Sequence, residues 1–421
     1  MKSIFKNLGF RRSKSKFIYI FLNNKIISLD TIVPIILDVK SRNETIKVIY
    51  ITFDYNTYEF IKLNKLLFKA IKEVGDLILL GRYKNSKYFN NKNIGKYHYK
   101  RLNFIIHLAK ILPHFLALIY NLITTKVIFI HFRALNTWPL KLLYYFNKNN
   151  TIFSSADSSG YSEQAYNADR SVHEQRTDLN KFLGPSPKGK SVIAFSNNWP
   201  LLKHPALLNS KKYIIRSSHS RKTWIDYLKS NFNNLIKEET NVELTNDCCL
   251  LLLGHIGQEA SGAMFLKNKN SWTTLVEDIL DIIHEECPQF KILIKPHIIT
   301  DMSLLQSILN KRKNLNVIIT SLHPALLSVK TRFSIASHYT TAFQSIHDIG
   351  GITIEYTDQK EKYRKKLNYK SKRPEYTTYF FNNDEQGFRS LLKDIRNNKV
   401  KSELKRGYDD DPSNLLNYLS E

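Results

Sequence analysis

Cysteine and long apolar runs are scarce in this chain of 421 residues, and acidic residues are outnumbered by basic ones. The three cysteines, Cys248, Cys249 and Cys287, lack metal-ligand spacing, and the first two lie in a predicted strand. We therefore expect neither a disulfide framework nor a zinc site, which fits a reducing cytoplasm. The basic residues 1–16 precede only a short apolar run, 17–22, which indicates a strand rather than a signal sequence.

The shortage of acidic residues leaves a formal net charge of +26, from 63 Lys and Arg against 37 Asp and Glu. Such a surface favours anionic partners, among them phosphorylated donors, acidic glycans, anionic lipids and nucleic acid. A nucleic-acid-binding module would cluster its basic and aromatic residues. Here Lys and Arg are spread along the chain and the aromatic residues lie largely in apolar runs, so a nucleic-acid partner is not expected.

Short apolar runs alternate with helical stretches through the first half of the chain. Runs of this type between helices are typical of βαβ units and a parallel sheet. We predict a Rossmann-like domain over residues 1–240. Its strands are expected at 17–22, 47–53, 76–80, 126–131, 151–154, 191–195 and 213–215, with helices at 29–39 and 222–236.

The apolar segment 103–123 is about as long as a membrane span. His107, Lys110 and His114 lie near its middle, where a charge inside a bilayer is costly. We therefore favour a helix or helix pair that packs on the sheet or lies on a membrane surface, with a true span as the alternative.

Strand and helix patterns restart after a predicted linker at 237–246. They indicate a second Rossmann-like domain over residues 241–421, with a charged helical tail. Its strands are expected at 248–253, 291–294, 317–320, 333–336 and 352–356, the last of the unit. Its helices are expected at 271–286, 304–309, 342–348 and 387–395.

Three strand ends in this second half carry residues that suit a phosphate. Pro296 has no N–H and stops its strand, which leaves a Lys and a His at the carboxyl end, where open α/β sheets bind ligands. Glycines allow close backbone approach to a phosphate, and Ser or Thr before a helix offers hydroxyl and N–H donors. The candidate donor-binding residues are Gly254, His255, Gly257, Lys295, Ser337, His338, Thr340 and Thr341.

This layout resembles the GT-B glycosyltransferases of bacterial surface polysaccharide synthesis. The nearest group uses CMP-linked acidic sugars, namely the sialyltransferases and Kdo transferases of capsule and lipopolysaccharide. Those enzymes carry a Lys-Pro-His-Pro turn, an acidic-plus-Gly motif and a later Ser/Thr-rich helix start. This chain has Lys295-Pro296-His297 with Ile298 at the second proline, Asp157 with Gly160, and residues 337–341.

The resemblance implies an α/β fold with two Rossmann-like domains facing across a cleft. The first would hold the acceptor and the second the nucleotide-activated donor. Metal-independent transfer must stabilise the charge on the leaving phosphate, which suits His297 and Lys295. It also needs a base for the acceptor hydroxyl, which suits Asp157 first and Glu163 second. No Asp-x-Asp motif accompanies the strand ends, so we predict no required metal and no other cofactor.

The expected partners are a nucleotide-sugar donor and a glycan or lipid-linked acceptor. A basic, apolar N-terminal surface would attract the protein from the cytoplasm to the inner face of the cytoplasmic membrane. Three other functions remain open: a CDP-polyol phosphotransferase of the wall-polymer type, a sugar-nucleotide epimerase that shares the fold, and a non-catalytic polyanion-binding protein.

Overall fold

The computed structural model describes residues 16–23, 26–80, 101–132, 135, 140–155, 190–195, 202, 207–244, 247–254, 266–267, 271–297, 300–409 and 414–421. The chain divides into two compact units. Unit 1 comprises Met1–Gly160, Glu174–Ser218 and Asp410–Glu421, and unit 2 comprises Tyr161–His173 and His219–Asp409.

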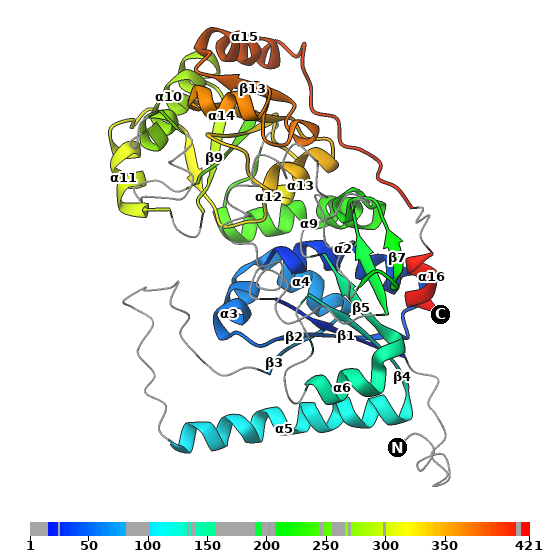
Figure 1. Cartoon of the computed structure of the whole chain (residues 1–421). Helices are drawn as coiled ribbons and strands as arrows, with labels where there is room; N and C mark the ends of the chain where they lie inside the picture. The colour runs from blue at the N-terminus through cyan, green and yellow to red at the C-terminus, as the bar shows by residue number, and fades with distance from the viewer. Residues whose placement is uncertain are drawn as a thin grey trace. The chain divides into compact units, whose positions relative to one another are not determined.

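Unit 1 is built on a seven-stranded parallel sheet in the order β3-β2-β1-β4-β5-β6-β7 (Figure 1). Its strands are β1 (Lys16–Phe21), β2 (Lys47–Thr52), β3 (Gly75–Leu79), β4 (Lys126–His131), β5 (Thr151–Ser154), β6 (Ser191–Ala194) and β7 (Lys211–Ile214). Its helices are α2 (Ile27–Arg42), α3 (Tyr55–Leu63), α4 (Lys65–Val74), α5 (Arg101–Thr124), α6 (Leu140–Asn147) and α16 (Leu415–Ser420).

Unit 2 repeats the plan with a six-stranded parallel sheet in the order β10-β9-β8-β11-β12-β13. Its strands are β8 (Cys248–Leu252), β9 (Lys291–Lys295), β10 (Val317–Ile319), β11 (Phe333–Ala336), β12 (Thr353–Thr357) and β13 (Tyr379–Asn382). Its helices are α9 (Lys222–Thr240), α10 (Ser271–Glu286), α11 (Met302–Asn310), α12 (Pro324–Leu327), α13 (Ala342–Asp348), α14 (Glu361–Lys366) and α15 (Glu385–Arg396).

The two sheets confirm the predicted α/β class with two parallel-strand domains. The central strands are mostly apolar because helices cover both faces of each sheet. In unit 2, β8 is completely buried, and α10 packs four apolar side chains of one face, Leu275, Ile279, Ile282 and Ile283, into the same core.

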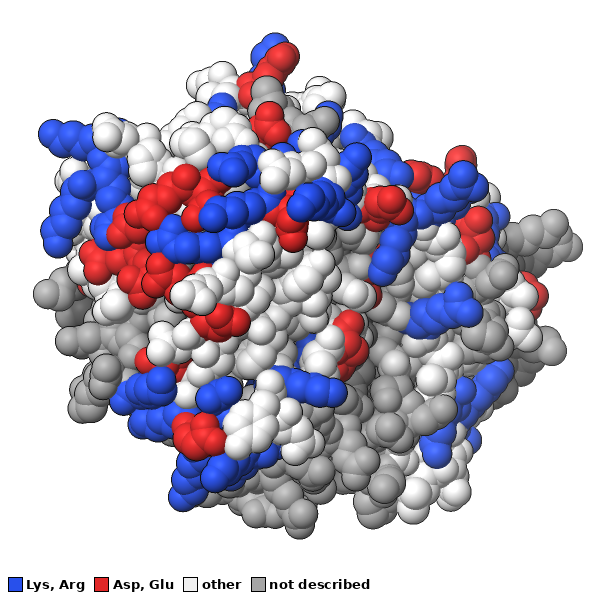
Figure 2. All heavy atoms as spheres, turned by 90° about the horizontal axis from the view of Figure 1, so that it is seen from above, with Lys and Arg blue, Asp and Glu red and all other residues white. Residues whose placement is uncertain are grey.

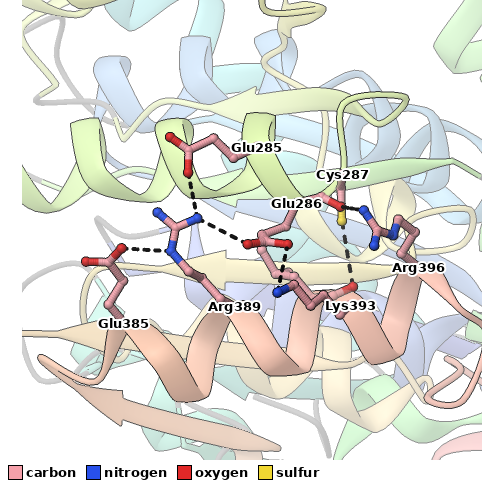
Figure 3. A network of polar contacts seen from close by, with 8 residues as sticks. Glu285, Glu286, Cys287, Glu385, Arg389, Lys393 and Arg396 are labelled. Carbon is pink, nitrogen blue, oxygen red and sulfur yellow. Dashed lines mark hydrogen bonds and ion pairs between the residues drawn. The ribbon is translucent and has the colours of Figure 1, made fainter.

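Ion pairs hold α15 against α10 on unit 2 (Figure 3). Arg389 of α15 contacts Glu285 at 2.6 Å and Glu286 at 3.2 Å on α10, and it also pairs with Glu385 of its own helix at 2.7 Å. The face of the molecule in Figure 2 likewise carries Lys and Arg interleaved with Asp and Glu. Several cations of unit 2, among them Arg312 and Arg389, are thus paired with carboxylates.

The units do not follow the predicted domain ranges. The expected linker at 237–246 begins inside α9, which belongs to unit 2 because Glu239 near its end accepts hydrogen bonds from Thr320 and Ser321. The C-terminal residues belong instead to unit 1, where α16 packs on α2. Leu415, Leu416 and Leu419 of α16 are buried there.

The prediction that 352–356 is the last strand of its unit is wrong. β13 pairs in parallel with β12 and extends the sheet by one edge strand. Its residues are only half-buried, and it follows a charged segment. A short edge strand of this kind gives a weak sequence signal, because only one of its sides is paired.

The segment 103–123 forms most of α5, which packs on the sheet of unit 1, so the preferred prediction of a packed helix is confirmed. Leu118 and Leu122 are buried against β1 and β4. Among the residues that the structure describes, no helix has the length and apolarity needed to cross a bilayer.

Candidate functional site at the strand ends of unit 2

Three neighbouring strands of unit 2 bring those predicted donor-binding residues that the structure describes to one edge of the sheet. The last residue of β9, Lys295, pairs with Leu252 of β8, which also pairs with the last residue of β11, Ala336. All three strands are parallel, so Gly254, the 295–297 turn and the 337–341 loop follow at the same edge. The strand order therefore gathers these residues as the sequence predicted.

Gly254 leaves room for the imidazole of His338. A Cβ atom at position 254 would lie 2.4 Å from Cε1 of His338, far inside van der Waals contact. The His338 ring also packs edge-on against the buried Trp272 of α10, with ring centroids 4.3 Å apart. The half-buried His338 ring therefore fixes the spacing between the ends of β8 and β11.

The turn after β9 is tied to the end of β8 through Thr300. The His297 N–H donates to Oγ1 of Thr300 at 2.8 Å, and the Thr300 N–H donates back to the His297 carbonyl at 2.9 Å. Oγ1 of the buried Thr300 donates in turn to the Gly254 carbonyl at 3.0 Å. The backbone of His297 is therefore fixed, while its side chain is exposed rather than turned into the core.

Lys295 and Glu239 both hold the loop that follows β10. The Lys295 ammonium donates to the Ser321 carbonyl at 2.7 Å. The Glu239 carboxylate accepts from the N–H of Ser321 at 2.6 Å, from its hydroxyl at 2.8 Å, and from Thr320 Oγ1 at 3.1 Å. The Lys295 side chain is half-buried and extends from the strand end toward this loop.

The loop between β11 and α13 presents hydroxyl groups that contribute little to capping the helix. Ser337 is buried, Thr340 is half-buried and Thr341 is exposed. The Thr341 side chain makes no cap hydrogen bond, and Thr340 Oγ1 accepts from Ala342 N–H only at 3.4 Å. A role as a plain helix cap therefore explains these threonines poorly.

Sequence reasoning missed Glu355, a fully buried carboxyl in the middle of β12. It accepts hydrogen bonds from Ser371 Oγ at 2.5 Å, from Gln359 Nε2 at 3.4 Å and from the backbone N–H of Tyr339. Burial raises the pKa of Glu355 to about 7, although the hydrogen bonds from Ser371 and Tyr339 act in the opposite direction. The acidic residue within an otherwise apolar run was the feature of the sequence that could have revealed Glu355. Its carboxylate binds the 337–341 loop directly, through the N–H of Tyr339.

We expect Glu355→Gln to stabilise the protein relative to wild type as the pH rises. The folded-state pKa, about 7, lies above the ordinary value of 4.5, so the carboxyl's contribution is complete below pH 4.5 and is lost as the pH rises through 7. Gln does not titrate, so the difference in unfolding free energy should shift in favour of the variant by roughly 3 kcal/mol between pH 4.5 and 8.

Urea unfolding at the two pH values measures this shift, and Glu403→Gln, at an exposed position, is the matched control. A difference between Glu355→Gln and wild type that is the same at both pH values would contradict a buried, titrating carboxyl.

Several predicted residues lie outside the residues that the structure describes. They are Asp157, Glu163, His255 and Gly257, together with Ile298 of the turn. Within the described residues, no group of three or more His, Cys, Asp or Glu side chains could hold a metal ion.

A separate polar pocket of about 320 Å³ lies at the opposite edge of the unit 2 sheet, where β10 begins. Asp281 and His284 of α10 and residues 310–315 line it. Arg312 binds Asp281 there through two hydrogen bonds of 2.6 and 2.8 Å. These contacts hold the α11–β10 loop on α10, and the pocket is remote from the strand ends that carry the candidate residues.

Solved structures with the same architecture match almost the whole chain. A UDP-GlcNAc 2-epimerase from Methanocaldococcus jannaschii aligns over 96% of this chain and 99% of its own, with a TM-score of 0.55 and 15% identity. The chain has a GT-B-type fold. S. aureus MnaA, in a co-structure with UDP, gives a TM-score of 0.52 at 12% identity over 97% of each chain.

A third structure, UDP-GlcNAc 2-epimerase from Neisseria meningitidis bound to UDP-GlcNAc, covers 96% of this chain and 98% of its own. Its TM-score is 0.51 at 12% identity. No protein-family model matches the sequence, and a search of curated proteins found no match. The GT-B part of the sequence resemblance is therefore confirmed, whereas its narrower part, the CMP-sugar group, stays a prediction.

Proposed function

We propose that this protein is a glycosyltransferase that moves a sugar from a nucleotide-activated donor to a glycan or lipid-linked acceptor. The observation that carries the proposal is the meeting of Gly254, the Lys295–His297 turn and the 337–341 loop at one sheet edge. Thr300 and Glu355 hold the turn and the loop by hydrogen bonds from buried positions. Such pre-organisation is what a site for a charged leaving group requires.

The donor's phosphates would lie at these strand ends. Lys295 supplies a point charge, Gly254 and Gly257 allow backbone approach, and Thr340 and Thr341 offer hydroxyl groups. Ser337, His255 and His338 complete the donor-binding residues, with His338 setting the distance between two strand ends. His297 would stabilise the charge that develops on the leaving phosphate. Unit 2 would thus bind the donor and unit 1 the acceptor.

On the acceptor side, Asp157 is proposed as the base that removes the hydroxyl proton, with Glu163 as the second candidate. Neither the CMP-linked acidic sugar nor any other single donor follows from the fold. The three similar structures include one with UDP and one with UDP-GlcNAc, which supports a nucleotide sugar in general. We also propose a cytoplasmic protein that works at the inner face of the membrane, where lipid-linked acceptors are presented.

Epimerisation of a sugar nucleotide is the second candidate, because the similar structures reported above include UDP-GlcNAc 2-epimerases. The two reactions differ in their need for an acceptor. An epimerase converts UDP-GlcNAc to its 2-epimer without one, and a transferase forms product only after an acceptor is added. Proton NMR of the donor, before and after addition of a membrane glycolipid fraction, separates them.

A thermal-shift screen with CMP, UDP, GDP, CDP and their sugars tests whether the protein binds a sugar nucleotide at all. A ligand that binds only the folded state raises the melting temperature, by an amount that grows with its concentration over Kd. We expect one nucleotide family and its sugars to raise it, while heparin at equal charge does not. Stabilisation by heparin and by no nucleotide would instead favour the polyanion-binding alternative.

A further inference from the structure

Helix α5 is apolar on two sides, and only one of them is used by the core. Leu118 and Leu122 face the sheet of unit 1 and are buried. Leu112, Leu116 and Tyr120 are 55%, 55% and 58% exposed. They are spaced by four residues, so they form a continuous line along the helix. The core of unit 1 does not explain this line.

The neighbouring helix α6 extends the apolar area. It packs on the same core cluster as α5 through the buried Leu143, and Figure 1 shows the two helices next to each other. Leu142 and Tyr145 of α6 are 41% and 74% exposed. We call these five side chains, Leu112, Leu116, Tyr120, Leu142 and Tyr145, the α5–α6 surface. They make up half of the ten large apolar side chains that are exposed within the described residues.

The stretch of sequence that forms this surface carries charge of a single sign. Residues 77–156 contain twelve Lys and Arg and no Asp or Glu, although the chain has 37 acidic residues. Lys110 of α5, Lys141 of α6 and Lys148 just beyond it are exposed. On unit 2, by contrast, Arg389 and Arg312 are paired with carboxylates. Cations that flank the α5–α6 surface have no acidic neighbours within this part of the sequence.

We propose that the α5–α6 surface binds the face of an anionic phospholipid bilayer. Apolar side chains would enter the boundary between headgroups and acyl chains, and the lysines would contact anionic headgroups. Tyr120 and Tyr145 suit this boundary, because a tyrosine ring is apolar and its hydroxyl is polar. Helix α5 would lie flat on the membrane, because Leu118 and Leu122 hold its other side on the sheet.

A second copy of the chain fits this surface less well. Symmetric pairing through α5 and α6 would bring the exposed lysines of one copy toward those of the other, and these two helices carry no carboxylate of their own to pair with them. An anionic bilayer instead complements both the apolar line and the charge. The inference rests only on unit 1, so it stands whether or not the chain transfers a sugar.

Co-sedimentation of the full chain with vesicles tests the inference. Wild-type protein should bind phosphatidylcholine vesicles that contain about a third phosphatidylglycerol, bind pure phosphatidylcholine much less, and dissociate as salt screens the lysines. Leu112→Ser with Leu116→Ser should lower the partition coefficient by about 10-fold or more, since two apolar side chains no longer enter the bilayer.

The matched control is Leu63→Ser with Leu208→Ser, two leucines of unit 1 that are 68% and 55% exposed outside the α5–α6 surface. All four positions are solvent-exposed, so both double variants should keep the wild-type melting temperature. Lys110→Glu with Lys141→Glu should weaken binding to the anionic vesicles but not to pure phosphatidylcholine vesicles.

Equal vesicle binding by the two leucine double variants would overturn the proposal, as would the failure of wild-type protein to bind anionic vesicles. A concentration-dependent dimer of the wild type, seen in analytical ultracentrifugation and lost in Leu112→Ser with Leu116→Ser, would overturn it in favour of a second copy of the chain.

Discussion

Replacement of His297 by alanine should lower the turnover number by about 100-fold or more and leave donor affinity nearly unchanged. The exposed imidazole extends from a turn whose backbone is fixed by Thr300. A contact that strengthens as charge develops on the leaving phosphate acts mainly in the transition state. Single-turnover kinetics and donor titration, carried out separately, distinguish this effect from a loss of binding.

His284→Ala is the control for this experiment. His284 is a histidine of the same unit that lines the polar pocket at the opposite edge of the sheet. We expect it to keep turnover within about 2-fold of wild type, as is usual for residues that touch no substrate. Normal turnover in His297→Ala, or equal losses in the two variants, would refute the assigned role of His297.

Asp157→Asn should abolish transfer while donor binding stays intact. A general base contributes about 10²–10⁴ to the rate, and an amide cannot take the proton from the acceptor hydroxyl. The donor nucleotide makes no use of this base, so the thermal shift that it causes should be unchanged. Product formation and the thermal shift, measured on the same preparation, give the two results.

Asp76→Asn is the matched control for this substitution, because Asp76 is an exposed aspartate of unit 1. Transfer that survives Asp157→Asn but is lost in Glu163→Gln would move the base to Glu163. Transfer that survives both substitutions would contradict a carboxylate base in this segment.

Local sequence patterns predicted most strands of both sheets, because each buried parallel strand is a short apolar run. β4, β5 and β11 have the predicted bounds, and so do the helices α10 and α13. The positions of Gly254, Lys295 and residues 337–341 at one edge also followed from the sequence. In a parallel sheet, the residues that follow neighbouring strands lie at the same edge, so this placement can be predicted without knowing any side-chain contact.

The elements that the sequence did not reveal depend on contacts between distant segments. Helix α16 is stable on unit 1 because its leucines bury against α2, more than 370 residues earlier, as the bond from Asn43 Nδ2 to the Ser420 carbonyl illustrates. β13 is a strand only because it pairs with β12. Neither interaction has a periodic signature in the sequence.

The supporting residues of the site were missed for the same reason. Thr300 connects the ends of β8 and β9, and Glu355 connects β12 to the 337–341 loop, in each case through a partner distant in sequence or on another element. Glu239 lies on a helix end that resembled a linker. The sequence thus predicted the residues proposed to face a ligand, but it did not predict the residues that hold them in place.

The location of the bound donor nucleotide tests most directly whether the strand ends of unit 2 form the donor site. Hydrogen exchange of the full chain, with and without the nucleotide sugar that raises the melting temperature most, reports it at peptide resolution. We expect slower exchange at residues 254–257, 295–300 and 337–341, and no change at 310–315 on the opposite edge of the sheet. Slower exchange confined to 281–284 and 310–315, or to unit 1, would contradict a donor site at the strand ends of unit 2.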